Sequence, residues 1–363
     1  MTALAAGIVR TRWRPFRLGM RHRFEAAHGA LDDRQGILVE VTTKDGSVGI
    51  GEASPMASLG QGTLSDVVAL IEVGALRAGA TIPDAPAASA LRCALDVALL
   101  DARARAQGTS VAALLGEGAP ATWVMANAVI GAGSVPDVAR HGQEAVAAGY
   151  AVLKMKVGVV TVAEDYRRLS ALREACPEVI LRVDANGAWD EKAANEATEA
   201  FASLDIELIE QPVPASDVEA LARVRERSPI RIAADESVVD PATLTRILAL
   251  RAADLIVLKP MLLGGLTPAY AIARRAAECG IGAFVTTTFD SSVGTAAALQ
   301  LAASLPADAA HGLSTGEHLA TDVVAQTLVP VRGRMVLPST PGLGVAVDDA
   351  ALEAVATGPW REA

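Results

Sequence analysis

Short apolar runs alternate with longer segments of helical periodicity through most of this chain. From about Thr122 onward the apolar runs recur at a nearly regular interval. They predict strands at residues 123–130, 151–157, 179–184, 206–210, 230–235, 255–259, 282–288 and 310–314. The segments between them predict helices that include residues 162–175, 191–203, 241–252 and 268–279. A strand–helix repeat of this length favours an α/β fold of the (β/α)8-barrel type over an open sheet.

The first 120 residues follow a different pattern. Residues 8–18, 36–42 and 48–50 predict strands, and Lys44-Asp45-Gly46 is a hairpin turn signal between the last two. Helical patterns follow at residues 63–78 and 87–107. This part therefore predicts a separate α+β module, and we expect the turn-rich tail from about residue 325 to return to it.

The composition indicates a large core and excludes several classes of partner. The chain has 363 residues, 20% of them charged, and a mean hydropathy of +0.33. A net charge of −10 argues against nucleic acid as the main partner. No apolar run approaches a membrane span, and the N-terminus shows no signal-peptide core. Three widely spaced cysteines have neither zinc nor disulfide spacing. We therefore expect a cytoplasmic protein with a small-molecule ligand and no membrane partner, and leave a homo-oligomer open.

Charged residues stand at the ends of several predicted strands, where apolar residues would otherwise be expected. These residues are Lys154, Lys156, Asp184, Glu210, Asp235 and Lys259. Parallel barrel strands point the same way, so these side chains should gather at one end of the barrel. Charged groups rarely end buried apolar strands unless they bind something.

The carboxylates Asp184, Glu210 and Asp235 predict a metal site. A set of carboxylates without cysteine or histidine suits a hard cation, which indicates Mg²⁺, with Mn²⁺ as a substitute. Without a cation, three converging anions would raise each other's pKa. The metal would hold a substrate carboxylate and stabilise the charge left when an α-proton leaves.

The lysines predict a general base. Lys154 and Lys156 share one strand face, and Lys259 should lie across the barrel. We expect these like charges to lower the pKa of a lysine and free it as a base.

Three neighbouring residues are candidates for substrate contact or for support of the metal ligands. Arg182 shares a strand face with Asp184, and both a salt bridge and a substrate contact remain open. Asn186 follows a strand end and could cap the next helix or line the site. Glu236 alternates away from Asp235, which favours a supporting role over direct metal binding.

The order of these residues resembles the enolase superfamily, and more closely its muconate cycloisomerase subgroup. Residues 184–189, 210–212 and 235–237 match the subgroup's pattern, and the resemblance covers nearly the whole chain. It implies a modified TIM barrel at residues 121–324 and an α+β capping domain at 1–120, joined by about 325–363. It also implies that Lys156 is the base and that Lys259 faces it across the substrate. Loops 24–29 and 54–62 would close over the barrel mouth.

Residues 51–56 with 60–63, 286–294 and 311–316 look like o-succinylbenzoate synthases. Within the last two segments, Thr288, Ser291 and Ser314 are candidates for substrate contact or for support of the site, as is Lys154. This likeness implies a hydro-lyase of menaquinone biosynthesis that dehydrates 2-succinyl-6-hydroxy-2,4-cyclohexadiene-1-carboxylate to o-succinylbenzoate. The 311–316 segment lacks the Asp-x-Asp of dipeptide epimerases, and strand six carries lysine instead of the histidine of mandelate racemase-like members.

Other readings of the same residues stay open. N-succinylamino acid racemisation, alone or beside dehydration, uses the same groups, as do cycloisomerisation and acid-sugar dehydration. A Schiff-base aldolase would need one lysine and no carboxylate triad. A non-catalytic ligand-binding protein on this fold would be expected to have lost one of the charged strand ends.

Overall fold

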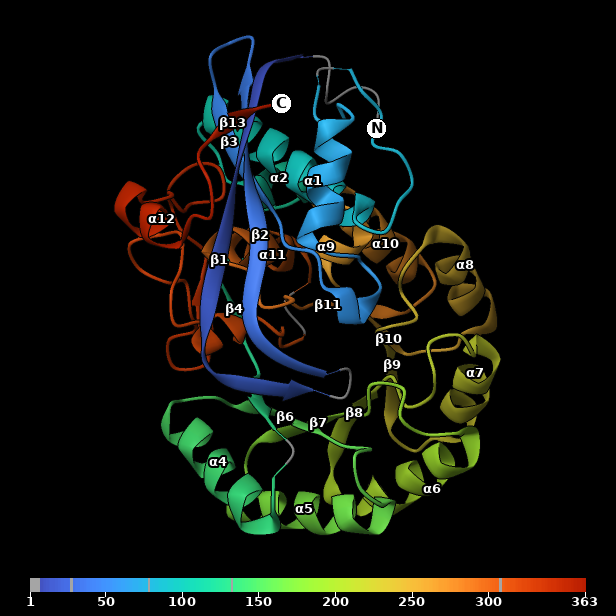
Figure 1. Ribbon diagram of the computed structural model, residues 1–363. Helices are drawn as coiled ribbons and strands as arrows, with labels where there is room; N and C mark the ends of the chain where they lie inside the picture. Colours follow the sequence, from blue (N-terminus) through green and yellow to red (C-terminus); the bar gives the residue numbers. More distant parts are fainter. Residues whose placement is uncertain (1–6, 27–28, 78, 132, 307–308) are drawn as a thin grey trace.

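One end of the molecule is an antiparallel sheet to which both ends of the chain contribute. The computed structural model describes residues 7–26, 29–77, 79–131, 133–306 and 309–363. Within these residues the sheet has four strands in the order β13-β1-β2-β3. Their bounds are β1 Ile8–Ala26, β2 Gly29–Thr43, β3 Val48–Ala53 and β13 Arg361–Glu362. β1 and β2 form a long hairpin that runs from this sheet toward the other half of the molecule (Figure 1).

Helix α2 crosses β3 at close range because β3 carries two glycines. A Cβ atom on Gly49 would lie 2.0 Å from the carbonyl oxygen of Ala98, and one on Gly51 would lie 2.0 Å from that of Ala94. Only glycine permits such an approach of backbone to backbone. The helices of this part are α1 Leu64–Glu72, α2 Ala88–Ala106 and α3 Val111–Leu115. The two predicted helices are therefore present, and the first ends earlier than expected.

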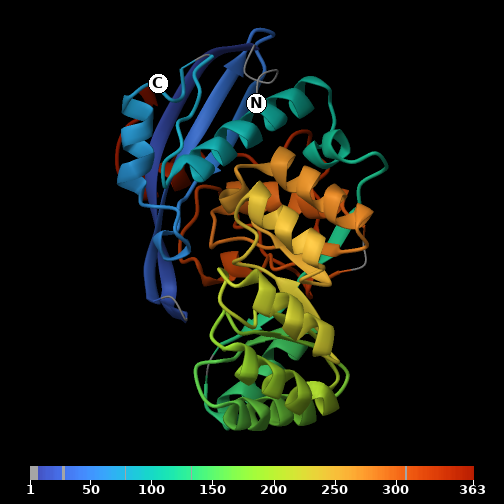
Figure 2. The same ribbon diagram turned by 90° about the vertical axis from the view of Figure 1, so that its right-hand side faces the viewer.

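The other half is a curled parallel sheet with helices on its outer face (Figures 1 and 2). In the described part of the chain it has seven strands in the order β11-β10-β9-β8-β7-β6-β5. The strands are β5 Ala128–Ile130, β6 Val152–Lys156, β7 Ile180–Asp184, β8 Ile206–Glu210, β9 Arg231–Ala234, β10 Leu255–Leu258 and β11 Gly282–Val285. The helices are α4 Val135–Ala147, α5 Val162–Ala175, α6 Glu191–Phe201, α7 Val218–Arg227, α8 Pro241–Leu250, α9 Pro260–Leu263, α10 Leu266–Glu278 and α11 Ser292–Ser304. The predicted barrel-type α/β fold is confirmed.

The barrel closes without a full eighth strand, which corrects the prediction for residues 310–314. His311 and Gly312 form isolated parallel bridges, His311 to Ala126 and Gly312 to Thr286. Two residues therefore connect β11 to the start of the barrel. The apolar pattern of this segment identified its place in the fold, but not how few of its residues pair.

The C-terminal tail contacts both halves of the molecule. β12 (Arg334–Val336) pairs with β4 (Trp123–Met125), so the predicted first barrel strand is split into β4 and β5. Farther along, α12 (Asp349–Val355) packs against β1, and β13 pairs with β1 as an antiparallel strand. The division into domains 1–120, 121–324 and 325–363 stays a prediction.

Local signals set the helix starts. Asp240 caps α8, because its Oδ1 accepts hydrogen bonds from the N–H groups of Ala242 at 2.7 Å and Thr243 at 3.0 Å. Pro241 occupies the first turn of this helix. A cap of this kind stabilises a protein by about 1 kcal/mol. Among the described residues, no helix is both long and apolar enough to span a membrane.

The barrel interior is layered. Its lower part is a separate apolar cluster of Leu208, Ala233, Leu255, Val257 and Phe284. Side chains two residues apart on a strand share a face, so Glu210 points inward one layer above Leu208. The apolar layer therefore forms the floor beneath the charged strand ends.

Candidate active site

The carboxyl ends of the barrel strands surround a pocket. Residues 286–289 after β11 and Met56, Ser58 and Leu59 after β3 complete its walls. Most of the predicted site residues line it, namely Lys154, Lys156, Asp184, Asn186, Glu210, Asp235, Glu236, Lys259, Thr288 and Ser314. The carboxyl-terminal face is where enzymes of this architecture carry their active sites.

The parallel register of three strands brings the charges together. Lys156 pairs with Asp184 across β6 and β7, and Asp184 pairs with Glu210 across β7 and β8. Residues in register on neighbouring parallel strands point to the same face. Asp235 and Lys259 follow the ends of β9 and β10 and reach the same layer.

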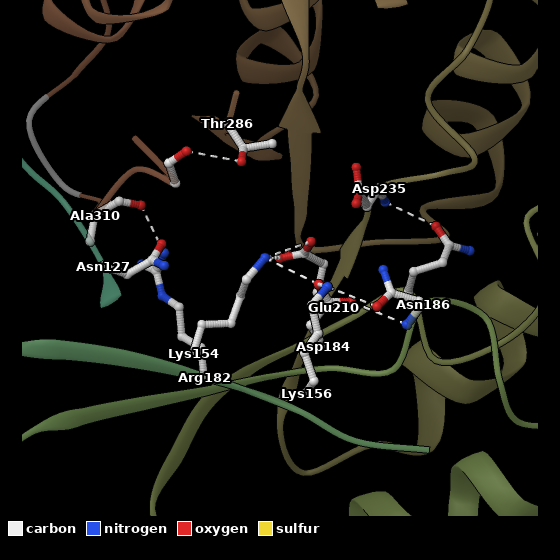
Figure 3. A network of polar contacts seen from close by, with 12 residues as sticks. Asn127, Lys154, Lys156, Arg182, Asp184, Asn186, Glu210, Asp235, Thr286 and Ala310 are labelled. Carbon is white, nitrogen blue, oxygen red and sulfur yellow. Dashed lines mark hydrogen bonds and ion pairs between the residues drawn. The ribbon is translucent and has the colours of Figure 1, made fainter. Parts of the chain in front are cut away.

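Each of the three lysines forms an ion pair with a carboxylate, and Figure 3 shows those of Lys154 and Lys156. The Lys154 ammonium donates to Oδ2 of Asp184 and to both carboxylate oxygens of Glu210, at 3.1 Å in each case. Lys156 Nζ lies 2.6 Å from Asp184 Oδ2. Lys259 Nζ lies 2.6 Å from Asp235 Oδ2. Above the apolar layer, the pocket is therefore bounded by a compact network of opposite charges.

Burial and the neighbouring lysines have opposite effects on the pKa values of the carboxyl groups in this network. Burial raises the pKa of Glu210 to about 8, and Asp184 adds to the rise while Lys154 opposes it. Burial also raises the pKa of Asp235, against the attraction of Lys259. For Asp184 burial acts in the same direction, but Lys156 and Lys154 outweigh it and hold the pKa well below its usual range.

The lowered pKa expected for a lysine of this set is not found at Lys154 or Lys259. Burial does disfavour the charged form of Lys154, but Glu210, Asp184 and Asp235 together raise its pKa above the ordinary value. Burial and Asp235 compete in the same way at Lys259, and its pKa is also raised. The prediction counted neighbouring lysines and left out the closer carboxylates.

The three carboxylates fit a hard divalent cation by their chemistry. All three are nearly inaccessible, with exposed fractions of 1% for Asp184, 1% for Glu210 and 4% for Asp235. Asp235 Oδ1 is buried and accepts no hydrogen bond within the described residues. Gln211 holds this residue in place, because its Oε1 accepts the main-chain N–H of Asp235 at 2.9 Å. An acceptor oxygen left open in such a set suits a metal ligand.

The arrangement is not yet a coordination shell. Across the described ranges, no three acidic, cysteine or histidine side chains converge so as to hold a metal ion. The Lys154 ammonium instead lies between Asp184 and Glu210. Metal binding by these carboxylates would therefore require Lys154 to move away from them.

Asn186 and Glu236 connect two of the strand ends. Asn186 has a left-handed backbone with φ of 46°, which places its side chain between neighbours. Its Oδ1 accepts from Lys156 Nζ at 2.8 Å, and its Nδ2 donates to Glu236 Oε1 at 2.8 Å. Of the two roles left open for Asn186, the structure shows the one in the pocket, since Asp190 caps the next helix.

Two predicted contacts lie elsewhere. Arg182 points into the lower layer, where its guanidinium donates to Glu207 at 2.5 Å and to the Ala310 carbonyl at 2.7 Å. It shares the strand face of Asp184 but sits one layer below. Ser291 is fully buried as the N-cap of α11 and donates to Glu52. Neither residue lines the pocket, and of the two roles predicted for Arg182 and Ser291, substrate contact or support of the site, these bonds correspond to support.

Sequence reasoning missed several pocket residues. Asn127 is fully buried and lines the pocket from the segment between β4 and β5. Thr286, Thr287 and Phe289 line it from the loop after β11. The polar run after an apolar strand was a usable signal for the threonines, whereas nothing local marked Asn127. Of the two predicted lid loops, residues 54–62 supply pocket walls, while residues 27 and 28 lie outside the described residues.

Comparisons with known proteins agree on a family. Residues 16–116 match the mandelate racemase / muconate lactonizing enzyme N-terminal domain, and residues 137–351 match the enolase C-terminal domain-like family. An L-Lys-D/L-Arg epimerase of Methylococcus capsulatus is 31% identical over 351 residues, which cover 93% of this chain and 96% of the epimerase. A chloromuconate cycloisomerase of Pseudomonas putida is 32% identical over 268 residues, which cover 71% of this chain and 70% of the cycloisomerase.

Solved structures give the same picture. A substrate-liganded L-Ala-D/L-Glu epimerase from Bacillus subtilis has a TM-score of 0.88 at 26% identity, covering 94% of this chain and 99% of its own. A dipeptide epimerase from Enterococcus faecalis, complexed with Mg and the dipeptide L-Leu-L-Tyr, has a TM-score of 0.87 at 28% identity with coverage of 94% and 99%. The similarity therefore extends over both halves of the molecule.

Proposed function

The chain belongs to the mandelate racemase / muconate lactonizing enzyme family, with an enolase-like C-terminal domain, and from this premise we propose that it is a Mg²⁺-dependent enzyme that removes a proton α to a carboxylate. One observation carries the proposal: Lys156 and Lys259, from separate strands, line one pocket together with three buried carboxylates. Known relatives include cycloisomerases and epimerases, so the family alone does not select one reaction.

Asp184, Glu210 and Asp235 would hold the cation. The pocket lining contains these three carboxylates, Glu236 and three lysines, which leaves a net charge of −1 when all are ionised. When bound, Mg²⁺ would hold the substrate carboxylate as a Lewis acid and would turn this net charge positive, which favours a neutral lysine.

Lys156 is the proposed base. Its amine would take the α-proton, and Asn186 would orient it through the 2.8 Å hydrogen bond. In a dehydration the resulting ammonium would then give its proton to the departing hydroxyl group, so that water leaves and no second base is needed. Lys259 would face the substrate from another strand and stabilise developing negative charge by its own positive charge.

The pocket walls favour a substrate without a free amino group. Among the described lining residues, Asp184, Glu210 and Asp235 bind lysines and Glu236 accepts from Asn186, so the wall opposite them offers no carboxylate to a substrate ammonium. The opposite wall offers hydroxyl groups from Thr286, Thr287, Thr288 and Ser314. In this structure these hydroxyl groups donate to Gly312, Asp290 and Asn127 or pair with Thr315. Turning one of them toward the substrate would let it bind a carbonyl group or a second carboxylate. We therefore propose dehydration of 2-succinyl-6-hydroxy-2,4-cyclohexadiene-1-carboxylate to o-succinylbenzoate as the reaction.

Racemisation of an N-succinylamino acid is the second candidate. Two lysines bonded to different carboxylates, Lys156 to Asp184 and Lys259 to Asp235, give the pocket two groups able to exchange a proton. An acylated amino group carries no positive charge, so the hydroxyl-rich wall suits this substrate class as well.

Parallel assays distinguish the two candidates. Purified protein would be tested for o-succinylbenzoate formation and for N-succinylamino acid racemisation, each with Mg²⁺ and with EDTA. We expect Mg²⁺-dependent dehydration to be the faster reaction. Racemisation alone would replace the first candidate by the second, and absence of both would reject the proposed substrates.

A further inference from the structure

Two pocket walls come from distant parts of the chain and must be held in register. Met56, Ser58 and Leu59 follow β3 of the N-terminal sheet, whereas Phe289 follows β11 of the barrel. We call residues 56–59 the lid segment. Its residues Met56, Ser58 and Leu59 line the same pocket as the lysine network.

A single buried arginine forms hydrogen bonds both to the chain just before the lid segment and to the loop after β11. Arg34 on β2 is 4% exposed. Its Nη2 donates to the Ser54 carbonyl at 2.7 Å, its Nη1 to the Pro55 carbonyl at 3.1 Å, and its Nε to the Phe289 carbonyl at 3.3 Å. The planar guanidinium thus fixes the residues just before the lid segment relative to the barrel loop.

Glu52 makes a second connection at the same place. Its Oε1 accepts from the Ser54 hydroxyl at 2.6 Å and from the Ser291 N–H at 3.1 Å. Its Oε2 accepts from the Ser291 hydroxyl and from the Gly294 N–H at 3.0 Å. A carboxylate from the N-terminal sheet therefore occupies the N-terminus of α11, where the helix dipole favours it.

The far end of the loop is also anchored. Gln61 Nε2 donates to the Met261 carbonyl at 2.7 Å, two residues after Lys259. Gln61 Oε1 accepts the Met56 N–H at 3.2 Å. The lid segment is thus a short arc, held on one side to the loop after β11 and on the other to α9, which follows Lys259.

We propose that Arg34 and Glu52 are positioning residues that set the shape of the pocket around the non-reacting end of the substrate. This inference rests on the proposed function only for its kinetic consequence. The chemistry of α-proton removal takes place at the lysine network, which neither residue contacts in any bond given above. Loss of either anchor should therefore weaken substrate binding more than it slows the chemical step.

The test compares Arg34→Met and Arg34→Lys with a matched control, Arg173→Met. Arg173 also donates to main-chain carbonyls, those of Pro177, Val179, Leu204 and Asp205, but it lies outside the pocket lining. The first measurement is amide hydrogen exchange of residues 54–62 and 286–291, which reports on the two anchored segments without any substrate. Melting temperature, kcat and KM for the dehydration substrate complete the comparison.

In Arg34→Met, exchange in both segments should rise about tenfold, and KM should rise about tenfold with a smaller change in kcat. In Arg34→Lys the rises in hydrogen exchange and in KM should both be smaller than in Arg34→Met. Arg173→Met should lower the melting temperature but should change neither hydrogen exchange in these segments nor KM. Equal behaviour of Arg34→Met and Arg173→Met would overturn the inference. If the dehydration substrate is not turned over, the exchange data still decide whether the anchor exists, and KM is then replaced by Kd for o-succinylbenzoate. Unchanged exchange with normal turnover would reject the anchor and leave the proposed function standing.

Discussion

The Lys156 ammonium nitrogen lies 2.6 Å from Oδ2 of Asp184, its register partner on the neighbouring strand. The proposed base and a proposed metal ligand thus share one hydrogen bond. A cation that takes up the Asp184 carboxylate would compete with this bond and leave the lysine to Asn186 and the substrate. Metal binding and the availability of the base are therefore expected to depend on each other.

Lys156→Ala should abolish proton abstraction. General base catalysis contributes roughly 10²–10⁴-fold, so kcat should fall by at least this factor. Steady-state kinetics with saturating Mg²⁺ measure the change. Lys192→Ala is a control on the exposed outer helix α6, where the same substitution should leave kcat unchanged. Wild-type kcat in Lys156→Ala would assign the base elsewhere.

Mg²⁺ should stabilise the protein through Asp184, Glu210 and Asp235. A ligand at 100 times its Kd that binds only the folded state adds about 2.7 kcal/mol. Thermal unfolding with increasing Mg²⁺ should therefore show a rising Tm in the wild type. Asp235→Asn should reduce the shift strongly, because Asp235 Oδ1 is a buried carboxylate oxygen without a hydrogen bond in the described structure. An equal shift in the variant would place the cation at another site.

Glu52 should make stability depend on pH. Burial, with Asp290 adding to it, raises the pKa of Glu52 to about 7 from an ordinary 4.5. A carboxyl group whose pKa is raised by folding contributes full stability below its unfolded pKa, and this contribution is lost as pH rises through the folded pKa. The free energy of unfolding should thus fall between about pH 4.5 and 7, by an amount on the order of 1–3 kcal/mol.

Urea unfolding of wild type and Glu52→Gln over this pH range tests the point. The variant should show a shallower decline, because its amide does not titrate. Glu353→Gln serves as the control, since the Glu353 side chain is 74% exposed. A decline of equal slope in Glu52→Gln and wild type would mean that other groups cause it.

Lys259→Arg should separate elimination from racemisation. Arginine keeps the positive charge but cannot act as a base near neutral pH. If one base suffices for dehydration, part of that activity should survive, while racemisation should be lost. Equal loss of both activities would argue against the roles given to the two lysines, and a structure of the variant would show whether altered geometry explains it.

Sequence pattern and strand register carry most of the fold and the central network. The period-two alternation of β6 and β7 places Lys156 and Asp184 on the inner face, and the strand ends place them in one layer. However, alternation shows which face of the sheet a side chain is on and does not show in which layer of the barrel interior it lies. Arg182 shares that inner face but lies below the network, where Glu207 and the Ala310 carbonyl hold it.

The remaining site depends on contacts between distant segments. Arg34 and Phe289 are far apart in the chain and meet only when the N-terminal sheet docks on the barrel. Ser291 seemed suited to a substrate contact because of its neighbours in sequence, but Glu52 from β3 takes its hydroxyl. No local pattern encodes such pairings, since they depend on how the two halves pack.

The central claim is metal-dependent removal of a proton α to a carboxylate, and proton NMR in D₂O tests it most directly. Purified protein with Mg²⁺ would be mixed with the cyclohexadiene carboxylate or with an N-succinylamino acid, and the α-proton signal followed over time. We predict that the signal disappears with Mg²⁺ and persists with EDTA and in Lys156→Ala. For the cyclohexadiene carboxylate, aromatic signals of the product should appear as the α-proton signal is lost. Loss of the signal at the same rate with EDTA, or its persistence in both substrates with Mg²⁺, would contradict the account.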